Sequence, residues 1–322
     1  MVRPRRDFGD QNVTEQLSLR VDEGAVVVHV ADAEIARYVF RPDTPLYESP
    51  KPYLHPLRTL AGEEVTLLRP HDHVWHRGIQ MTATSVSGSN FWGGATYVHG
   101  SGYVDLDNQG QMLHRSWEDV GVADGRAVLR EALDWLDEDG DRMLEEHREI
   151  EFADVAPQAG RYRIRFRLAL RNVTDRRLEF SSPTIAGRPE SGYGGLFWRG
   201  PRSFTGGQVF TSDGTTDAAA AMGSASPWLA FVGQHDGSGR FSTLVFVDHP
   251  ENVRYPTKWF VRSQPFACVS FAFMFDEILA LPAAEELRLT HDVIVADGAL
   301  EAEDVARLVN HVPGRTDSEH VA

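Results

Sequence analysis

Apolar and polar residues alternate with a period of two along much of the chain, which is the pattern of β-strands with one buried face. Residues 161–170 show it most clearly, because every second residue is apolar and arginines fill most positions between them. The acidic, glycine-containing segment 137–141 predicts a hairpin turn between strands at 127–136 and 142–152. Further strands are predicted at residues 25–30, 79–82, 241–247, 269–275 and 287–295.

Helical periodicity is rare in the sequence. The best helix is predicted at residues 300–312, where acidic residues in the first turn suit the helix dipole. Residues 218–222 are small and predict either one helical turn or a loop. Many strands with few helices predict the all-β class, as a large antiparallel β-sandwich. We expect a single domain over residues 15–312, with loose ends at residues 1–14 and 313–322.

The chain has 322 residues and a formal net charge of −15. Because nucleic acids and anionic membranes attract basic surfaces, we expect neither as a partner, whereas a neutral sugar or a cationic ligand is compatible with this charge. No segment has the ~20 apolar residues needed to cross a bilayer. The first 16 residues hold no apolar stretch of signal-peptide length, so we expect a cytoplasmic protein. The single cysteine, Cys268, lies in an apolar run and is expected in the core.

Histidines gather in two short stretches, residues 55–58 and 69–78. The ordinary pKa of histidine lies near neutrality, so His73 and His76 are candidates for proton transfer. Asp72 is placed to orient a neighbouring imidazole. The alternative interpretation is a polar turn in which the histidines hydrogen-bond to backbone groups.

A metal site is a second alternative for the histidine cluster. His55, His73 or His76 would then bind a transition metal together with a distant ligand. The spacing of three between His73 and His76 places them on one side of a helix but on opposite sides of a strand, and the alternation after Gly78 favours a strand. The segment also differs from the helical zinc signature His-Glu-x-x-His. We therefore predict no metal ligands and keep metal binding as an alternative.

Two later segments combine glycine, aromatic and charged residues. Residues 187–200 do not match the Gly-x-x-x-x-Gly-Lys phosphate loop, and they offer contacts to a ligand unless their aromatic residues belong to the core. Residues 247–260 are dense in hydrogen-bonding groups and aromatic rings. A sugar has apolar C–H faces and hydroxyl edges, so rings beside polar groups suit it. The candidates for stacking, each also typical of a core, are Trp92, Trp198 and Trp259.

These segments, together with residues 53–58, 72–78 and 90–93, resemble a bacterial family of unknown function called DUF6807, also labelled PmoA. The stretch Asp-His-x-x-His-Arg-Gly at residues 72–78 is the most specific match, and the resemblance extends from about residue 20 to 312. It implies a fold similar to the galactose mutarotase-like β-supersandwich, and it implies carbohydrate chemistry. The methane-oxygenase name behind the PmoA label does not fit a chain without a membrane span.

The resemblance implies that one general acid and one general base act on a sugar ring. His73 or His76 would be the acid, and Glu190 or Asp248 the base. The expected substrate contacts are His55, Arg58, Asp72, Arg77, Trp92, Tyr193, Arg199, His249, Tyr255 and Trp259. We thus expect an epimerase, isomerase, lyase or hydrolase that acts on a sugar or modified glycoside.

Other functions remain open at this point. A non-catalytic carbohydrate-binding protein needs only the aromatic rings, and a metal-dependent enzyme needs only the histidines. A scaffold protein would bind no ligand. We expect no cofactor unless a transition metal is held by the histidines, and unmatched strand edges are compatible with a homodimer.

Overall fold

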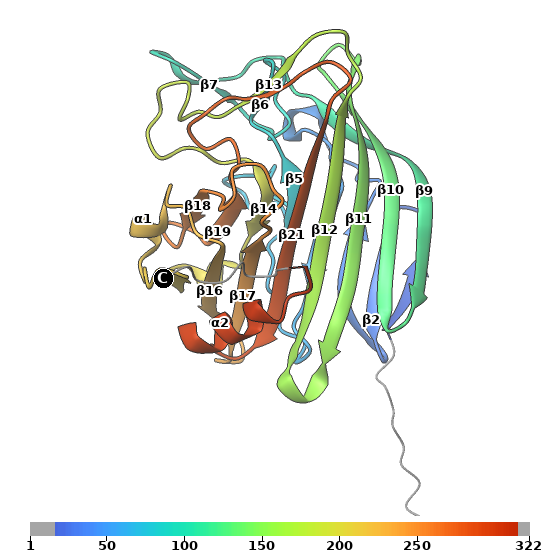
Figure 1. The fold of residues 1–322 in the computed structure, drawn as a ribbon, viewed down its shortest axis with the longest axis vertical. Coiled ribbons are helices and arrows are strands. Elements are labelled where there is room, and N and C mark those ends of the chain that lie inside the picture. The colour runs from blue at the N-terminus through green and yellow to red at the C-terminus, as the bar shows by residue number, and fades with distance from the viewer. Residues whose placement is uncertain (1–16, 315–322) are drawn as a thin grey trace, which may run out of the picture.

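A computed structural model describes residues 17–314. Two antiparallel sheets of eight strands each form most of the molecule, so the predicted all-β sandwich is confirmed (Figure 1). The predicted loose ends at 1–14 and 313–322 lie outside the described residues, apart from Pro313 and Gly314. Neither α-helix within residues 17–314 has the length and apolar composition needed to cross a membrane.

The first sheet is built from short strands whose order departs from the chain order. In spatial order they are β1 (Leu17–Val21), β2 (Ala25–Val30), β3 (Ala33–Val39), β4 (Tyr53–Leu57), β5 (Ile79–Thr82), β14 (Gly195–Arg199), β19 (Cys268–Phe271) and β18 (Trp259–Arg262). Segments far apart in the sequence therefore meet along β5, β14, β19 and β18. The predicted strand at 269–275 ends early, at Phe271, which is the last residue of β19 paired with β18.

The second sheet contains the long strands. In spatial order they are β15 (Gln208–Thr211), β16 (Trp228–Gln234), β17 (Phe241–Asp248), β21 (Glu286–Asp297), β12 (Arg161–Asn172), β11 (Arg142–Ala156), β10 (Arg126–Leu136) and β9 (Gln111–Ala123). The predicted hairpin turn at 137–141 joins β10 to β11. Two small sheets complete the fold: β20 (Leu279–Leu281), β13 (Leu178–Ser181) and β6 (Ser85–Val86), and β7 (Thr96–Val98) with β8 (Gly102–Val104).

The main core lies between the two large sheets. Trp198 of β14 contacts Phe246 of β17 with ring centroids 5.5 Å apart, and Phe246 in turn contacts Phe271 of β19. Tyr162, Ile164 and Phe166 of β12 face the same core, and Leu168 and Leu170 of the same strand face a second apolar cluster. Cys268 is buried, as predicted.

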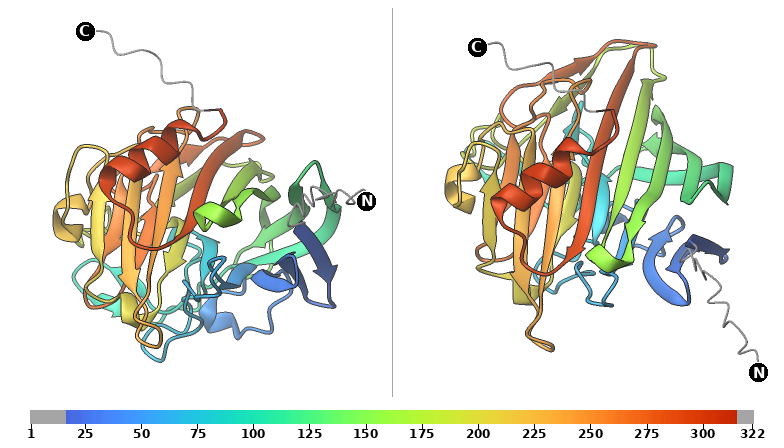
Figure 2. Two further views of the ribbon diagram at one scale, coloured as in Figure 1. Left: turned by 90° about the horizontal axis from the view of Figure 1, so that it is seen from below. Right: turned by 60° about the horizontal axis from the view of Figure 1, so that its bottom comes forward.

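A helix covers the outer face of the second sheet. Helix α2 (Ala302–Asn310) lies across β16, β17 and β21, where Val305 and Val309 pack on Ile294 (Figure 2). It confirms the helix predicted at 300–312. The short segment at 218–222 resolves into one helical turn, α1 (Ala218–Ala221), which the carboxylate of Asp217 caps.

The arginine face of β12 is buried in part beneath the chain that follows α2. Arg163 and Arg165 both donate to the carboxylate of Asp292 on β21, and Arg165 also donates to the carbonyl of Pro313. Alternation alone predicted which residues share a face, whereas the burial of the guanidinium groups depends on this carboxylate.

Candidate functional site

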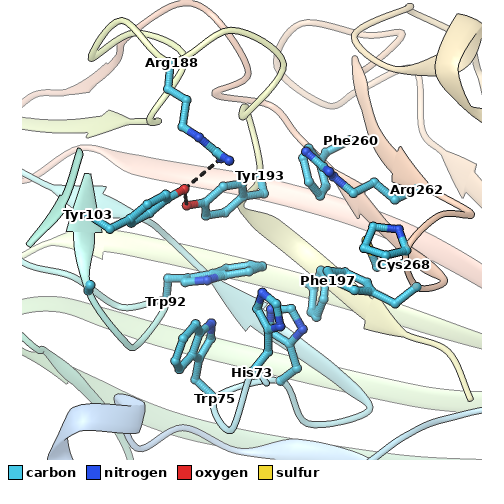
Figure 3. Close-up of a pocket in the computed structure, with 14 residues that line it drawn as sticks. His73, Trp75, Trp92, Tyr103, Arg188, Tyr193, Phe197, Phe260, Arg262 and Cys268 are labelled. Carbon is cyan, nitrogen blue, oxygen red and sulfur yellow. Dashed lines mark hydrogen bonds between the residues drawn. The ribbon is translucent and has the colours of Figure 1, made fainter. Parts of the chain in front are cut away.

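A cavity of about 410 Å³ lies beside β14, β18 and β19, at the edge of the first sheet (Figure 3). Its walls are mainly aromatic and come from distant parts of the chain: Trp75, Trp92, Tyr103, Tyr193, Phe197, Phe260 and Phe266. Two imidazoles, His73 and His76, and two guanidinium groups, Arg188 and Arg262, supply its polar character. The volume falls within the range of small-molecule sites, roughly 300–1,000 Å³.

Two consecutive turns bring His73 and His76 together. The amide of His73 donates to the carbonyl of Pro70 at 3.0 Å, and the amide of His76 donates to that of His73 at 2.9 Å. The imidazole rings stack with centroids 4.7 Å apart and planes 25° apart. The expectation of opposite strand faces is thus wrong, because the strand begins only at Ile79 and the histidines precede it.

His76 is held neutral by its surroundings. Its ring is buried against Trp92 and Phe197. Burial lowers its pKa well below the ordinary value, and the positive charges of His73 and Arg199 lower it further. Nη1 of Arg199 lies 3.4 Å from Nδ1 of His76. A guanidinium only donates, so Nδ1 is the acceptor and we place the proton of the neutral ring on Nε2, which has no partner among the described residues.

His73 is less buried and has a carboxylate beside it. Its Nδ1 lies 3.4 Å from Oδ2 of Asp72, without hydrogen-bond geometry. Burial lowers the pKa of His73, and the negative charge of Asp72 partly opposes that shift. Asp72 itself accepts a hydrogen bond from Arg202 at 3.0 Å and does not line the cavity, so it acts on the site through His73.

Arg199 contacts His76 and Phe266 beside the cavity. Its guanidinium carbon lies 3.7 Å above the ring centroid of Phe266, and the whole residue is buried. Nε and Nη2 have no hydrogen-bond partner among the described residues. Burial lowers the pKa of Arg199 to about 10. The predicted ligand contact is thus adjacent to the cavity, where it touches His76 and Phe266.

A group of charged residues, of which Glu48, Lys51 and Arg77 are buried, contacts the chain at Trp92. Arg77 and Arg69 both donate to Glu48. Burial alone would raise the pKa of Glu48, but these two hydrogen bonds lower it. Nζ of Lys51 donates to three carbonyls, including that of Trp92 at 3.1 Å. Arg77, predicted as a ligand contact, thus pairs with Glu48 and does not line the cavity.

The residues predicted between 248 and 259 lie away from the cavity. Asp248, expected as a base, is fully buried and accepts from Asn252 and from the amide of Thr257. His249 binds Asp292 at 2.5 Å, within the ion cluster on the second sheet. Both side chains thus hydrogen-bond to groups of their own neighbourhood and do not line the cavity.

The two aromatic candidates of that segment also lie outside the cavity. Trp259 belongs to the main core and donates from Nε1 to the carbonyl of Ser226 at 2.9 Å. Tyr255 is half-buried and does not line the cavity. Neither ring is therefore free to stack on a ligand of this cavity.

Three other predicted residues are also separated from the cavity. Glu190, expected as a base, is exposed in a left-handed backbone conformation with φ of 51°. His55 hydrogen-bonds to Oγ1 of Thr66 at 2.9 Å, and Arg58 pairs with Glu64 at 3.4 Å. None of the three lines the cavity. Within residues 17–314, no carboxylate does so, and the predicted pair of histidine and carboxylate is not assembled.

Sequence reasoning found only part of the cavity wall. His73, His76, Trp92 and Tyr193 were predicted, and all four line it. The residues missed are Trp75, Tyr103, Arg188, Phe197, Phe260, Arg262 and Phe266. Trp75, Arg188, Phe197 and Phe260 lie within the segments singled out above, and Arg262 and Phe266 follow one of them. Tyr103 lies outside all of these segments. Within residues 17–314, no group of three or more His, Cys, Asp or Glu side chains is arranged to hold a metal ion.

The fold and site define an all-β sandwich with one aromatic, histidine-bearing cavity at a sheet edge. The model of the family of unknown function DUF6807 matches residues 25–310, and the chain belongs to that family. No curated protein matches the sequence.

The chain is also similar to solved carbohydrate-active proteins at low scores. Galactose 1-epimerase from Lactobacillus acidophilus NCFM shares 10% identity at a TM-score of 0.39, over 88% of this chain and 99% of that one. A GH36 α-galactosidase from Geobacillus stearothermophilus, in complex with raffinose, shares 13% identity at a TM-score of 0.36, over 88% of this chain and 41% of that one. The galactosidase domain of an α-galactosidase-sucrose kinase shares 11% identity at a TM-score of 0.36, over 88% of this chain and 39% of that one. Scores this low carry no argument about the fold or the reaction of this chain.

Proposed function

We propose that the protein binds a small carbohydrate in this cavity and catalyses proton transfer on it, with His73 as the base and the neutral imidazole of His76 as a hydrogen-bond donor to the substrate. The observation that carries the proposal is the stacked pair of imidazoles at 4.7 Å in a cavity with aromatic walls. Aromatic faces suit the C–H faces of a sugar ring, and imidazoles suit proton transfer near neutral pH.

The two imidazoles are unequal, which supports separate roles. We assign to Nε2–H of the neutral His76 ring the role of hydrogen-bond donor to a sugar oxygen, because its Nδ1 already accepts from Arg199. We assign the acceptor role to His73, whose imidazole lies beside the charge of Asp72. A pair of histidines thus replaces the pair of histidine and carboxylate expected from the sequence.

The chemistry that such a pair supports is proton movement on a sugar carbon or oxygen, as in epimerases, isomerases and lyases. A non-catalytic binding protein would use the same aromatic walls and would need no neutral imidazole with an unpartnered nitrogen. The unpartnered Nε2 of His76 therefore favours the enzyme.

The test uses a panel of aldoses, keto-sugars and uronates in D₂O, with NMR to follow anomer exchange and deuterium incorporation. We expect turnover of one sugar class by the wild type and a loss of roughly 10²- to 10⁴-fold in His76→Gln. His147→Gln is the control, because that histidine is exposed on the second sheet, where it pairs with Glu118. Wild-type turnover in His76→Gln refutes the catalytic role. Binding without turnover in the wild type would instead identify a carbohydrate-binding protein.

A further inference from the structure

We infer that the sugar bound in this cavity carries an acid group, and that Arg262 and Arg188 bind it; the inference rests on the proposed function. Arg262 ends β18, and Arg188 lies in the loop between β13 and β14. Figure 3 shows both guanidinium groups on one side of the cavity and His73 on the other. Two elements distant in sequence thus direct positive charge at one end of a single cavity.

Neither guanidinium is neutralised by the protein. Arg188 donates to two hydroxyls, those of Tyr103 at 2.8 Å and Ser191 at 2.6 Å. Arg262 lies 5.3 Å from the ring centroid of Phe260, and its side chain hydrogen-bonds to no other within residues 17–314. Neither of them forms an ion pair with a carboxylate in that part of the chain. Both retain donors that a ligand oxyanion would satisfy.

This absence of carboxylates does not follow from the composition. The chain has 47 acidic and 32 basic residues, so carboxylates are in excess. Arg163 and Arg165, which are buried on the second sheet, do have a carboxylate partner, Asp292. A neutral sugar would leave the cavity arginines without a counter-charge, whereas an acidic sugar supplies it.

The position of the arginines also orients the ligand. Tyr193 lies 4.6 Å from Trp92, and Trp92 lies 5.2 Å from His76, measured between ring centroids. These rings connect the end that holds the arginines with the end that holds the histidines. An acid group at Arg262 therefore leaves the sugar ring against the aromatic wall and directs its far end to the imidazoles. This arrangement suits a uronate or another sugar acid of similar length.

The experiment compares matched sugars that differ only in the acid. Dissociation constants of glucose and glucuronate, of galactose and galacturonate, and of glucose 6-phosphate are measured by calorimetry for wild type, Arg262→Gln and Arg171→Gln. Arg171 is an exposed arginine on β12 and serves as the control for loss of one positive charge. Arg262 makes no side-chain hydrogen bond in residues 17–314, so its glutamine variant should fold.

We expect the acidic member of a pair to bind at least tenfold more tightly than the neutral one, and Arg262→Gln to remove that preference while Arg171→Gln keeps it. A preference for glucose 6-phosphate over the uronates supports the inference and identifies the acid as a phosphate. Equal binding of acidic and neutral sugars, unchanged in Arg262→Gln, overturns the inference and leaves the proposed function standing. Binding of no sugar, acidic or neutral, overturns both.

Discussion

Replacing Asp292 by asparagine removes the charge at the centre of the ion cluster on the second sheet. The carboxylate is fully buried and accepts from Arg163 at 2.9 Å, from Arg165 at 2.9 and 2.8 Å, and from His249 at 2.5 Å. Burial alone would raise its pKa, but the hydrogen bonds from His249 and Arg165 and the positive charges of both arginines lower it far below the ordinary value. The asparagine variant keeps the shape of the side chain and loses this charge.

The loss of stability depends on which partners Arg163 and Arg165 keep in the variant. Removing one member of a buried ion pair destabilises a protein by about 3–5 kcal/mol. Arg163 keeps Glu151 at 3.1 Å and Asp154 at 2.6 Å, whereas Arg165 keeps only the carbonyl of Pro313. We therefore expect the lower end, about 3 kcal/mol. An unfolding entropy of about 2.1 cal/mol/K per residue gives about 0.7 kcal/mol/K for 322 residues, so the Tm should fall by about 4 °C.

The measurement is calorimetry together with urea unfolding followed by tryptophan fluorescence. Asp119→Asn is the matched control, because Asp119 is exposed and its pair with Arg130 at 2.8 Å is worth less than about 1 kcal/mol. The folded pKa of Asp292 lies below the unfolded one, so its contribution is complete above pH 4 and is lost as pH falls through the folded pKa. Sugar binding in the cavity should be unchanged. An Asp292→Asn variant that matches Asp119→Asn in stability, or one that is stable and no longer binds sugar, would refute the structural role.

Two further titratable groups give independent checks. Burial raises the pKa of the Cys268 thiol to about 12, so its alkylation by iodoacetamide at pH 8 should be at least ~100-fold slower in the native protein than in guanidinium chloride, and equal rates would contradict its burial. Burial, with the charge of Arg58, lowers the pKa of His55 to about 4 from 6.5 in the unfolded chain. Between pH 6.5 and about 4 the unfolded chain binds a proton at His55 and the folded protein does not. The free energy of unfolding should therefore fall by up to ~3 kcal/mol as the pH is lowered through this window. Unfolding of His55→Gln should depend less steeply on pH in that window, and parallel curves for the two proteins would count against the shift.

Much of the fold was predictable because the long strands obey a simple rule. One face of strand β12 is buried in two apolar clusters along its length, so its sequence alternates. The hairpin at 137–141 was visible because acidic residues and a glycine interrupt that alternation. The two small sheets were not predicted, since strands of two to four residues such as β6 and β20 show no periodicity. Their pairing depends on contacts between segments far apart in the chain.

The site was predictable only where local sequence determines it. His73 and His76 are three residues apart, so a turn is enough to stack them. Asp248 and His249 have the same kinds of side chain in an equally polar loop, yet they bind groups of their own neighbourhood. Which partner satisfies a buried polar group depends on the tertiary structure. Arg262 was missed for the converse reason, because nothing in its local sequence shows that it faces a cavity.

The net charge of the chain suggested a neutral or cationic ligand, and the cavity leads to the opposite conclusion. Net charge is a sum over the whole surface, whereas a ligand responds to the few groups within a short distance. The carboxylates nearest the cavity are already engaged: Glu48 with Arg69 and Arg77, and Asp72 with Arg202. The charges that remain directed at the cavity are those of Arg188 and Arg262. Carboxylates are in excess over the chain as a whole, and the cavity is nevertheless positive because Arg188 and Arg262 have no carboxylate partner within residues 17–314.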